Sequence, residues 1–184
     1  MPTVVEPIAI PADCTLHASA RTASFADAYA VLVPHSSLSA TQIYAAVVQN
    51  TPGWVEGLMG LRNQVVKRLG LKNLGQLADV PNVPVGAEHT LRVGDRLGLF
   101  SLVRATPDEL VMQDDDKHLT VQLSVLKVSV NALHDRITLS TVVHVKNTLG
   151  RLYMLPVGPM HKIIAPAVLR RAPGAVARAV QIAP

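Results

Sequence analysis

Two long runs of alternating apolar and polar residues, joined at residues 131–135, constrain this chain more than any other feature. The apolar positions are Leu119, Val121, Leu123 and Val125 in the first run and Ile137, Leu139, Val143 and Val145 in the second. A period of two over this length is typical of antiparallel strands with one buried face. A sheet with one apolar face needs other elements to cover it. The sequence therefore predicts an α+β fold.

The apolar parity shifts within the first of these strands. Apolar residues are odd-numbered up to Val125 and even-numbered from Leu126 onward. A shift of one residue predicts a β-bulge, which bends the strand. We therefore expect a strongly curved sheet.

Three further strands are expected. The first covers residues 24–33, where Asp27 interrupts the apolar face and Pro34 ends the strand. The second covers residues 95–104, with apolar residues on both parities, and residues 109–113 return from it after a turn at 106–108. Residues 71–94 form a long connection rich in proline and glycine.

A helix beginning after Ser39 is predicted by its capping residues. Ser39 and Gln42 have the spacing of a capping box, and Leu38 and Ile43 have that of a hydrophobic staple. Thr51 is then expected as the N-cap of a second short helix.

The second helix carries an apolar stripe at helical spacing. The stripe is Trp54, Leu58, Leu61, Val65 and Leu69. Gly70 is the expected residue after its end. Core packing is the expected role of Trp54, with the rim of a cavity as the alternative.

The last part of the chain has a helical pattern. The apolar stripe consists of Met160, Ile163, Ile164, Ala167 and Val168. Pro156, Pro159 and Pro166 predict that this helix is broken or kinked. Residues 173–184 are interpreted as an Ala-rich tail and residues 1–23 as an N-terminal arm, so that one domain covers residues 24–172.

This order of elements resembles the helix-grip fold of the Bet v 1/START-like (SRPBCC) superfamily, a curved antiparallel sheet wrapped around a long C-terminal helix. Several segments resemble one bacterial family, domain of unknown function 2867. They are Pro52-Gly53-Trp54-Val55, Leu61-Arg62-Asn63, Gly94-Asp95-Arg96, Asp115-Asp116-Lys117-His118-Leu119, residues 147–153 and Pro159-Met160-His161. The resemblance implies the helix-grip fold and no assigned activity, cofactor or catalytic residue.

Composition argues against several classes of function. The chain has 184 residues, a net charge of +4 and only 3% aromatic residues, and its basic residues are scattered. Nucleic-acid binding is therefore not expected. Cys14 is the only cysteine, which excludes an internal disulfide and a thiolate metal cluster. No signal peptide or uninterrupted apolar span is recognised, so we expect a cytoplasmic protein without a membrane span.

A sheet that wraps a helix commonly leaves an apolar cavity with a few polar groups, and candidate ligand contacts follow from that expectation. The candidates are Trp54, Leu58, Phe100, Ser101, His118, Thr141, Tyr153 and His161. Ser101 and Thr141 are assigned to the inward parity of their strands; the alternative for each is a core hydroxyl bonded to backbone. The alternative for His161 is a helix-surface residue.

One cluster in the sequence contains residue types that bind metal ions: Asp114, Asp115, Asp116 and His118. Successive strand residues point to opposite faces, so only Asp116 and His118 could converge, and no second carboxylate or His cluster supports them. A solvated turn is therefore favoured, and neither a metal nor a cofactor is expected. Three functions stay open. The first is binding of a small apolar or amphipathic molecule, the second is an enzyme using the same cavity for acid/base or hydrolytic chemistry, and the third is an interaction module or homodimer.

Overall fold

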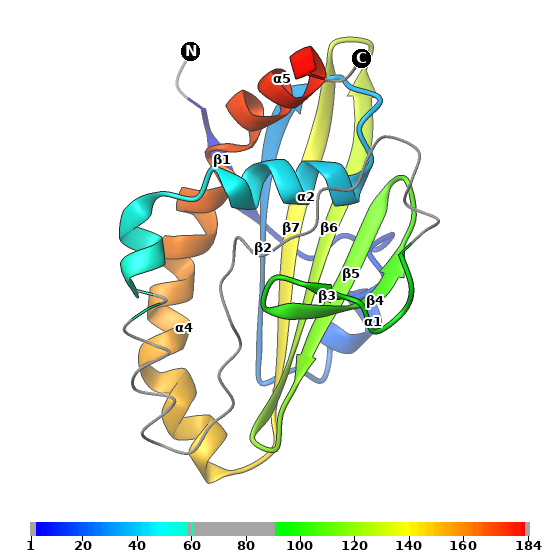
Figure 1. Ribbon diagram of the computed structural model, residues 1–184. Coiled ribbons are helices and arrows are strands. Elements are labelled where there is room, and N and C mark those ends of the chain that lie inside the picture. Colours follow the sequence, from blue (N-terminus) through cyan, green and yellow to red (C-terminus); the bar gives the residue numbers. More distant parts are fainter. Residues whose placement is uncertain (1–2, 59, 61–90, 183–184) are drawn as a thin grey trace.

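The computed structural model describes residues 3–58, 60 and 91–182, and in this part of the chain seven strands form one antiparallel sheet (Figure 1). The spatial order of the strands is β1-β2-β7-β6-β5-β4-β3. The strands are β1 (Val5–Ile8), β2 (Phe25–Pro34), β3 (Arg96–Leu97), β4 (Phe100–Ala105), β5 (Glu109–Asp115), β6 (Leu119–Asn131) and β7 (His134–Val145). The helices are α1 (His17–Ala20), α2 (Ala40–Gln49), α4 (Thr148–Leu169) and α5 (Ala172–Ile182). The predicted mixed α+β fold with a curved antiparallel sheet and a long C-terminal helix is confirmed.

The β6–β7 hairpin lies at the centre of the sheet, as its alternation predicts. The strands pair from Leu119 opposite Val145 to Asn131 opposite His134. Asn131 Oδ1 accepts hydrogen bonds from the backbone N–H groups of Leu133 and His134, each at 2.9 Å. This side chain therefore stabilises the tight turn between the strands.

One face of the sheet, which we call the inner face, carries the main hydrophobic core. Strand residues on this face are Tyr29, Val31, Val33, Leu110, Met112, Leu123, Val125 and Ile137. Helix α2 crosses this face, and α5 and the last turns of α4 complete its cover (Figure 1). The capping box of α2 is confirmed: Ser39 N–H donates to Gln42 Oε1 at 2.9 Å and Gln42 N–H donates to Ser39 Oγ at 3.3 Å.

The opposite, outer face is covered at one end by the N-terminal segment. Cys14 and Leu16 are buried against Val111, Leu126 and Val142. Strand β1 also pairs with β2 at the edge of the sheet. Cys14, Leu16 and strand β1 of the N-terminal segment are therefore packed on the sheet, and burial raises the pKa of the Cys14 thiol.

The β-bulge expected at Val125 and Leu126 is wrong. Pairing with β5 runs without interruption through both residues, and the register shift of β6 lies between Ser129 and Asn131 instead. Leu126 is apolar because it faces the N-terminal segment on the outer face. The change of parity therefore marks a place where both faces of the sheet are covered.

The single strand predicted for residues 95–104 is a hairpin. Strands β3 and β4 pair directly at Leu97 and Phe100, with Gly98 at a φ of 63° in the turn. Glycine adopts this left-handed conformation without the steric cost of a side chain. The strand expected at 24–33 is confirmed as β2.

Helix α4 runs unbroken from Thr148 to Leu169 with Pro156, Pro159 and Pro166 inside it, so the predicted break is wrong, and a kink, the alternative to a break, stays a prediction. The chain turns only afterwards, at Arg170 and Arg171, before α5. Each proline removes one backbone donor, and the remaining helical bonds hold the helix together.

The segment Thr148–Gln181 is long and apolar enough to cross a membrane by length and composition alone. The expectation of no membrane span stays a prediction.

The expected tail at residues 173–184 is wrong as far as residue 182, because α5 packs against α2 and β2. Ala172, Ala175 and Val176 are buried at helical spacing. Alanine has the highest helix propensity, and here it allows close contact with α2. The Ala-rich composition therefore indicates a packed helix.

The second predicted helix is described only in part. Residues 53–58 are helical, while Leu61, Val65 and Leu69 lie outside the described residues. Thr51 Oγ1 donates to the carbonyl of Val48 at 2.7 Å, so it closes α2 and is not the expected N-cap. Trp54 is 48% exposed, which contradicts its expected place in the core.

Glu109 is a buried carboxylate that joins the N-terminal segment to the sheet. Its oxygens accept hydrogen bonds from Thr15 N–H at 2.9 Å, from the Thr15 hydroxyl and from Ser124 Oγ at 2.8 Å. Burial by itself would raise the pKa of Glu109, but these hydrogen bonds outweigh it and hold the pKa below its usual value. The folded state therefore favours the charged carboxylate.

Replacing Glu109 by Gln should lower the free energy of unfolding at pH 7 by about 1–3 kcal/mol, because a buried charged acceptor is lost. Since the pKa of Glu109 is depressed on folding, its contribution is present above the unfolded pKa, about 4.3, and disappears as the pH falls through the folded value. Urea unfolding from pH 7 to pH 3 should show the difference from wild type shrinking. The exposed Glu56→Gln variant controls for loss of a charge, and a constant difference for Glu109→Gln would contradict the prediction.

Candidate functional site

A cavity of about 150 Å³ lies between the inner face of the sheet and helices α2 and α4. The lining is almost entirely apolar. It consists of Ile43, Tyr44, Val47, Val48, Leu99, Phe100, Leu123, Val125, Ile137, Leu139, His161, Ile164, Ala165, Val168 and Leu169. Two residues with polar groups, Tyr44 from α2 and His161 from α4, are thus among the residues that line an otherwise apolar cavity.

The hydroxyl group of Tyr44 is buried and has no hydrogen-bond partner among the described residues. Tyr44 is only 5% exposed. Burial raises the pKa of Tyr44 far above its usual value, so the hydroxyl keeps its proton and stays a donor. A buried donor without a partner costs stability.

His161 contacts two polar residues of the sheet. Its Nε2 lies 3.1 Å from Thr141 Oγ1 and 3.2 Å from Asp27 Oδ1. Asp27 and Thr141 are opposite each other on β2 and β7, which places both on the face beneath α4. The ring of Phe25 meets the imidazole edge to face, with centroids 5.8 Å apart. The cavity therefore has an imidazole in its wall, held by a hydroxyl and a carboxylate.

Asp27 is a carboxylate in a mostly buried place. Its two oxygens are buried and make no hydrogen bond to the described residues, so the contact with His161 is electrostatic and depends on a protonated imidazole. Burial raises the pKa of Tyr29, and the neighbouring Asp27 carboxylate raises it further. Asp27, Tyr29, Thr141 and His161 thus form one polar cluster beside the apolar cavity.

Helix α2 is held against the sheet by the loop before it. Asp135, fully buried, accepts hydrogen bonds from His35 Nδ1 at 2.8 Å and Ser36 N–H at 3.1 Å. Burial would raise the pKa of Asp135, but these bonds and the nearby Lys127 outweigh it and lower it. Lys127 Nζ donates to the carbonyls of Ser36 and Leu38 at 3.1 and 2.8 Å. The cavity wall formed by α2 is therefore tied to β6 and β7.

Helix α4 is positioned from its first turn. Asn147 caps it by accepting from Gly150 N–H at 3.0 Å, and its amide donates to Lys117 O at 3.1 Å. A Cβ on Gly150 would lie 2.3 Å from the carbonyl oxygen of His118. Only glycine allows this approach between α4 and the β5–β6 turn.

The structure brings together three of the candidate residues. Phe100 and His161 line the cavity, and Thr141 contacts His161. Leu58 is partly buried and Trp54 exposed, and neither lines the cavity. The predicted contact of Trp54 and Leu58 with the cavity is therefore not seen among its lining residues.

The other three candidates also lie outside the cavity lining. Ser101 is opposite Gln113, on the outer face, so the inward parity assigned to it is wrong; the β3–β4 hairpin places Phe100 and Leu102 inward instead. His118 lies in the turn after β5, where Asn147 Nδ2 approaches its Nδ1 at 2.9 Å. Tyr153 is partly buried on α4, two turns before His161.

Two residues of the site were missed by the sequence analysis. Asp27 gave a signal, because it interrupts the apolar face of its strand. Tyr44 adjoins the apolar positions Ile43, Val47 and Val48 of α2, and nothing in the pattern separates its hydroxyl from an ordinary core residue. In the described part of the chain no group of three His, Cys, Asp or Glu residues could hold a metal ion.

Comparisons with known proteins give a family but no activity. The family model described as "Protein of unknown function (DUF2867)" matches residues 19–168. The crystal structure of CalU16 from Micromonospora echinospora is similar at a TM-score of 0.31 and 10% sequence identity, with 96% of each chain covered. No curated protein matches the chain.

The two hydroxyls of the site should respond differently to removal. Tyr44→Phe should leave the free energy of unfolding unchanged or raise it, because no hydrogen bond is lost. Thr141→Val should lower it by about 1 kcal/mol, because His161 loses its hydroxyl partner. Chemical denaturation of both variants measures this, and a loss above about 1 kcal/mol for Tyr44→Phe would show that its hydroxyl is bonded.

Proposed function

The chain belongs to the family described as "Protein of unknown function (DUF2867)", and from the cavity we propose that it binds a small apolar molecule between the sheet and helices α2 and α4. The observation that carries the proposal is the apolar cavity of about 150 Å³, lined in part by Tyr44, whose buried hydroxyl has no hydrogen-bond partner among the described residues. The proposal includes a fold of helix-grip type, which the order of strand, helix, antiparallel strands and long C-terminal helix supports.

An empty cavity of this size costs stability. A closed void of about 150 Å³ in a protein core would cost roughly 3–4 kcal/mol at about 24 cal/mol per Å³, and because this cavity is partly open its cost lies below that value. The unpartnered Tyr44 hydroxyl adds about 1–3 kcal/mol. A ligand that fills the space and accepts a hydrogen bond from Tyr44 would recover part of both amounts, which favours a binding role over imperfect packing.

The size and polarity of the cavity select the ligand. An engineered apolar cavity of about 150 Å³ in another protein stays dry and binds benzene. We therefore expect a guest near the size of a single six-membered ring, or a larger molecule that inserts such a group. The ligand should carry one hydrogen-bond acceptor, placed for Tyr44, on an otherwise apolar skeleton.

Benzene, toluene and phenol should each raise the thermal midpoint of the protein, because a ligand bound only by the folded state stabilises it. Phenol should bind roughly threefold to tenfold more tightly than benzene, since its oxygen accepts a hydrogen bond from Tyr44. In Tyr44→Phe this preference should disappear while benzene still binds. Thermal shift and NMR titration measure both effects.

A variant that fills the cavity is the matched control. Ala165 lines the cavity and is buried on α4, so Ala165→Met should occupy part of the space and abolish the shift with benzene while preserving the fold. Absence of any shift with all three compounds in the wild-type protein, at millimolar concentration, would refute the binding proposal.

The polar cluster supports a second candidate function, proton transfer on a small carbonyl compound. In this reaction His161 takes a proton from the carbon next to the carbonyl group, and Tyr44 donates a hydrogen bond to the oxygen that becomes the enolate. Both groups line the same cavity. Asp27, 3.2 Å from Nε2, would stabilise the imidazolium that forms.

Hydrogen–deuterium exchange of cyclopentanone in D₂O, followed by NMR, tests this second function. The protein should accelerate exchange, and His161→Gln and Asp27→Asn should each reduce the enzymatic rate by tenfold or more. An exchange rate equal for wild type and His161→Gln would leave the cavity as a binding site only.

A further inference from the structure

The outer face of the sheet is covered at one end and bare at the other. The N-terminal segment covers the end at Val111, Leu126 and Val142. At the end near the β6–β7 turn, apolar side chains are exposed. We call these residues the hairpin patch: Val4, Leu32, Val128, Val130 and Leu133.

The members of the hairpin patch lie on and around three neighbouring strands, with Arg136 between Leu32 and Val128. Val128 on β6 is opposite Arg136 on β7, and Arg136 is opposite Leu32 on β2. Val4 precedes β1, and Leu133, 73% exposed, lies in the β6–β7 turn. Isolated exposed apolar residues are ordinary, but several gathered at one end of a sheet suggest an interaction surface.

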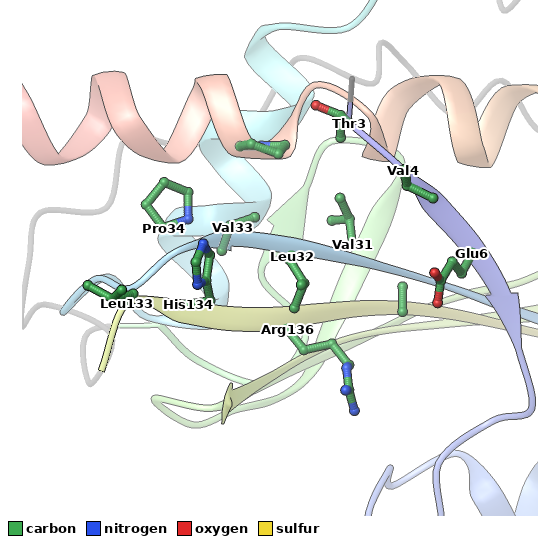
Figure 2. Close-up of a pocket in the computed structure, with 12 residues that line it drawn as sticks. Thr3, Val4, Glu6, Val31, Leu32, Val33, Pro34, Leu133, His134 and Arg136 are labelled. Atoms are coloured by element: carbon green, nitrogen blue, oxygen red, sulfur yellow. The ribbon is translucent and has the colours of Figure 1, made fainter. Parts of the chain in front are cut away.

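A groove of about 540 Å³ lies beside this surface, at the edge of the sheet along β2, and its lining includes Leu32, Leu133 and Arg136 as well as the inner-face residues Val31 and Val33 and Pro173 of α5 (Figure 2). Figure 2 shows Glu6, Leu32 and Arg136 extending from three neighbouring strands. The surface therefore combines a projecting leucine at the turn with a hollow beside it.

Two opposite charges border the apolar residues. Glu6 on β1 and Arg136 on β7 are both exposed, and neither forms an ion pair with another described residue. The patch thus presents one free carboxylate and one free guanidinium. A surface with both charges can be complementary to itself.

We propose that the hairpin patch is the interface of a homodimer, in which a second copy of this chain docks with two-fold symmetry. In such an interface a contact between residue i and residue j occurs twice, once in each direction. Glu6 of each copy therefore pairs with Arg136 of the other. Leu133 of each copy enters the groove of its partner, so the same docking buries the exposed leucines and valines.

Other surfaces of the described chain suit a second copy less well. Edge strand β1 contains Pro7, which has no N–H to donate, and the opposite edge strand β3 has only two residues. Helix α4 exposes Leu152, Leu155 and Ile163, but its charged residues, Arg151 and Lys162, are both basic. Charge therefore opposes the docking of two copies of α4, whereas the hairpin patch carries both signs of charge.

Charge exchange between the two positions tests the proposal. Sedimentation velocity of the full chain should show a dimer at micromolar concentration. Glu6→Arg and Arg136→Glu should each raise the dissociation constant about tenfold or more, because each places like charges together twice. The double variant Glu6→Arg/Arg136→Glu, and an equimolar mixture of the two single variants, should restore the dimer.

Two further variants locate the interface. Leu133→Gln should weaken the dimer, while Leu152→Gln on α4 should leave it unchanged, with circular dichroism confirming that both fold. A monomeric wild type at 100 μM, a mixture that fails to restore the dimer, or dissociation by Leu152→Gln would each overturn the proposal. None of these variants changes a residue that lines the cavity. A failure of the dimer proposal can therefore be distinguished from a failure of the ligand-binding proposal.

Discussion

Everything in this fold depends on covering both faces of one antiparallel sheet with a chain that contains few aromatic residues. The inner face is apolar along β2, β5, β6 and β7, and it is covered by α2, α5 and the end of α4. Those helices meet the core through small residues such as Ala165, Ala172 and Ala175. Small contact residues bring the helix backbones close, but they do not fill the curved space completely. The cavity is therefore a result of how the cover is made, and Tyr44 and His161 are the polar groups that reach it.

The two faces have different kinds of cover. Helices form it on the inner face, whereas the outer face receives only the irregular N-terminal segment, which is anchored by hydrogen bonds between Glu109, Thr15 and Ser124. Because this segment is short, the outer face near the β6–β7 turn is bare. The same sheet thus has an apolar cavity on its inner face and exposed apolar side chains at one end of its outer face.

The sequence predicts the central hairpin, the capping of α2 and the α+β class because each depends on local periodicity or on residues close in the chain. It does not predict features that depend on distant contacts. Leu126 suggested a bulge because nothing local shows that Cys14 and Leu16 cover its side of the sheet. The helix α5 was interpreted as a tail because alanines look weakly apolar until α2 lies against them. In the site, His161 and Thr141 were named as candidates, but their contact with each other and with Asp27 required the fold.

The hydrogen bonds that hold the loop before α2 affect how a ligand would reach the cavity. Asp135 and Lys127 hold the loop before α2 by four hydrogen bonds to strands that cannot move without disturbing the central hairpin. Helix α4 has only Gly150, Gly158, Ala165 and Leu169 buried along its 22 residues. Between the two ends of α4, His161 connects the helix to the sheet through its contacts with Thr141 and Asp27. A ligand would therefore enter and leave past α4, and the rate of exchange would depend on how often the contacts of His161 with Thr141 and Asp27 break.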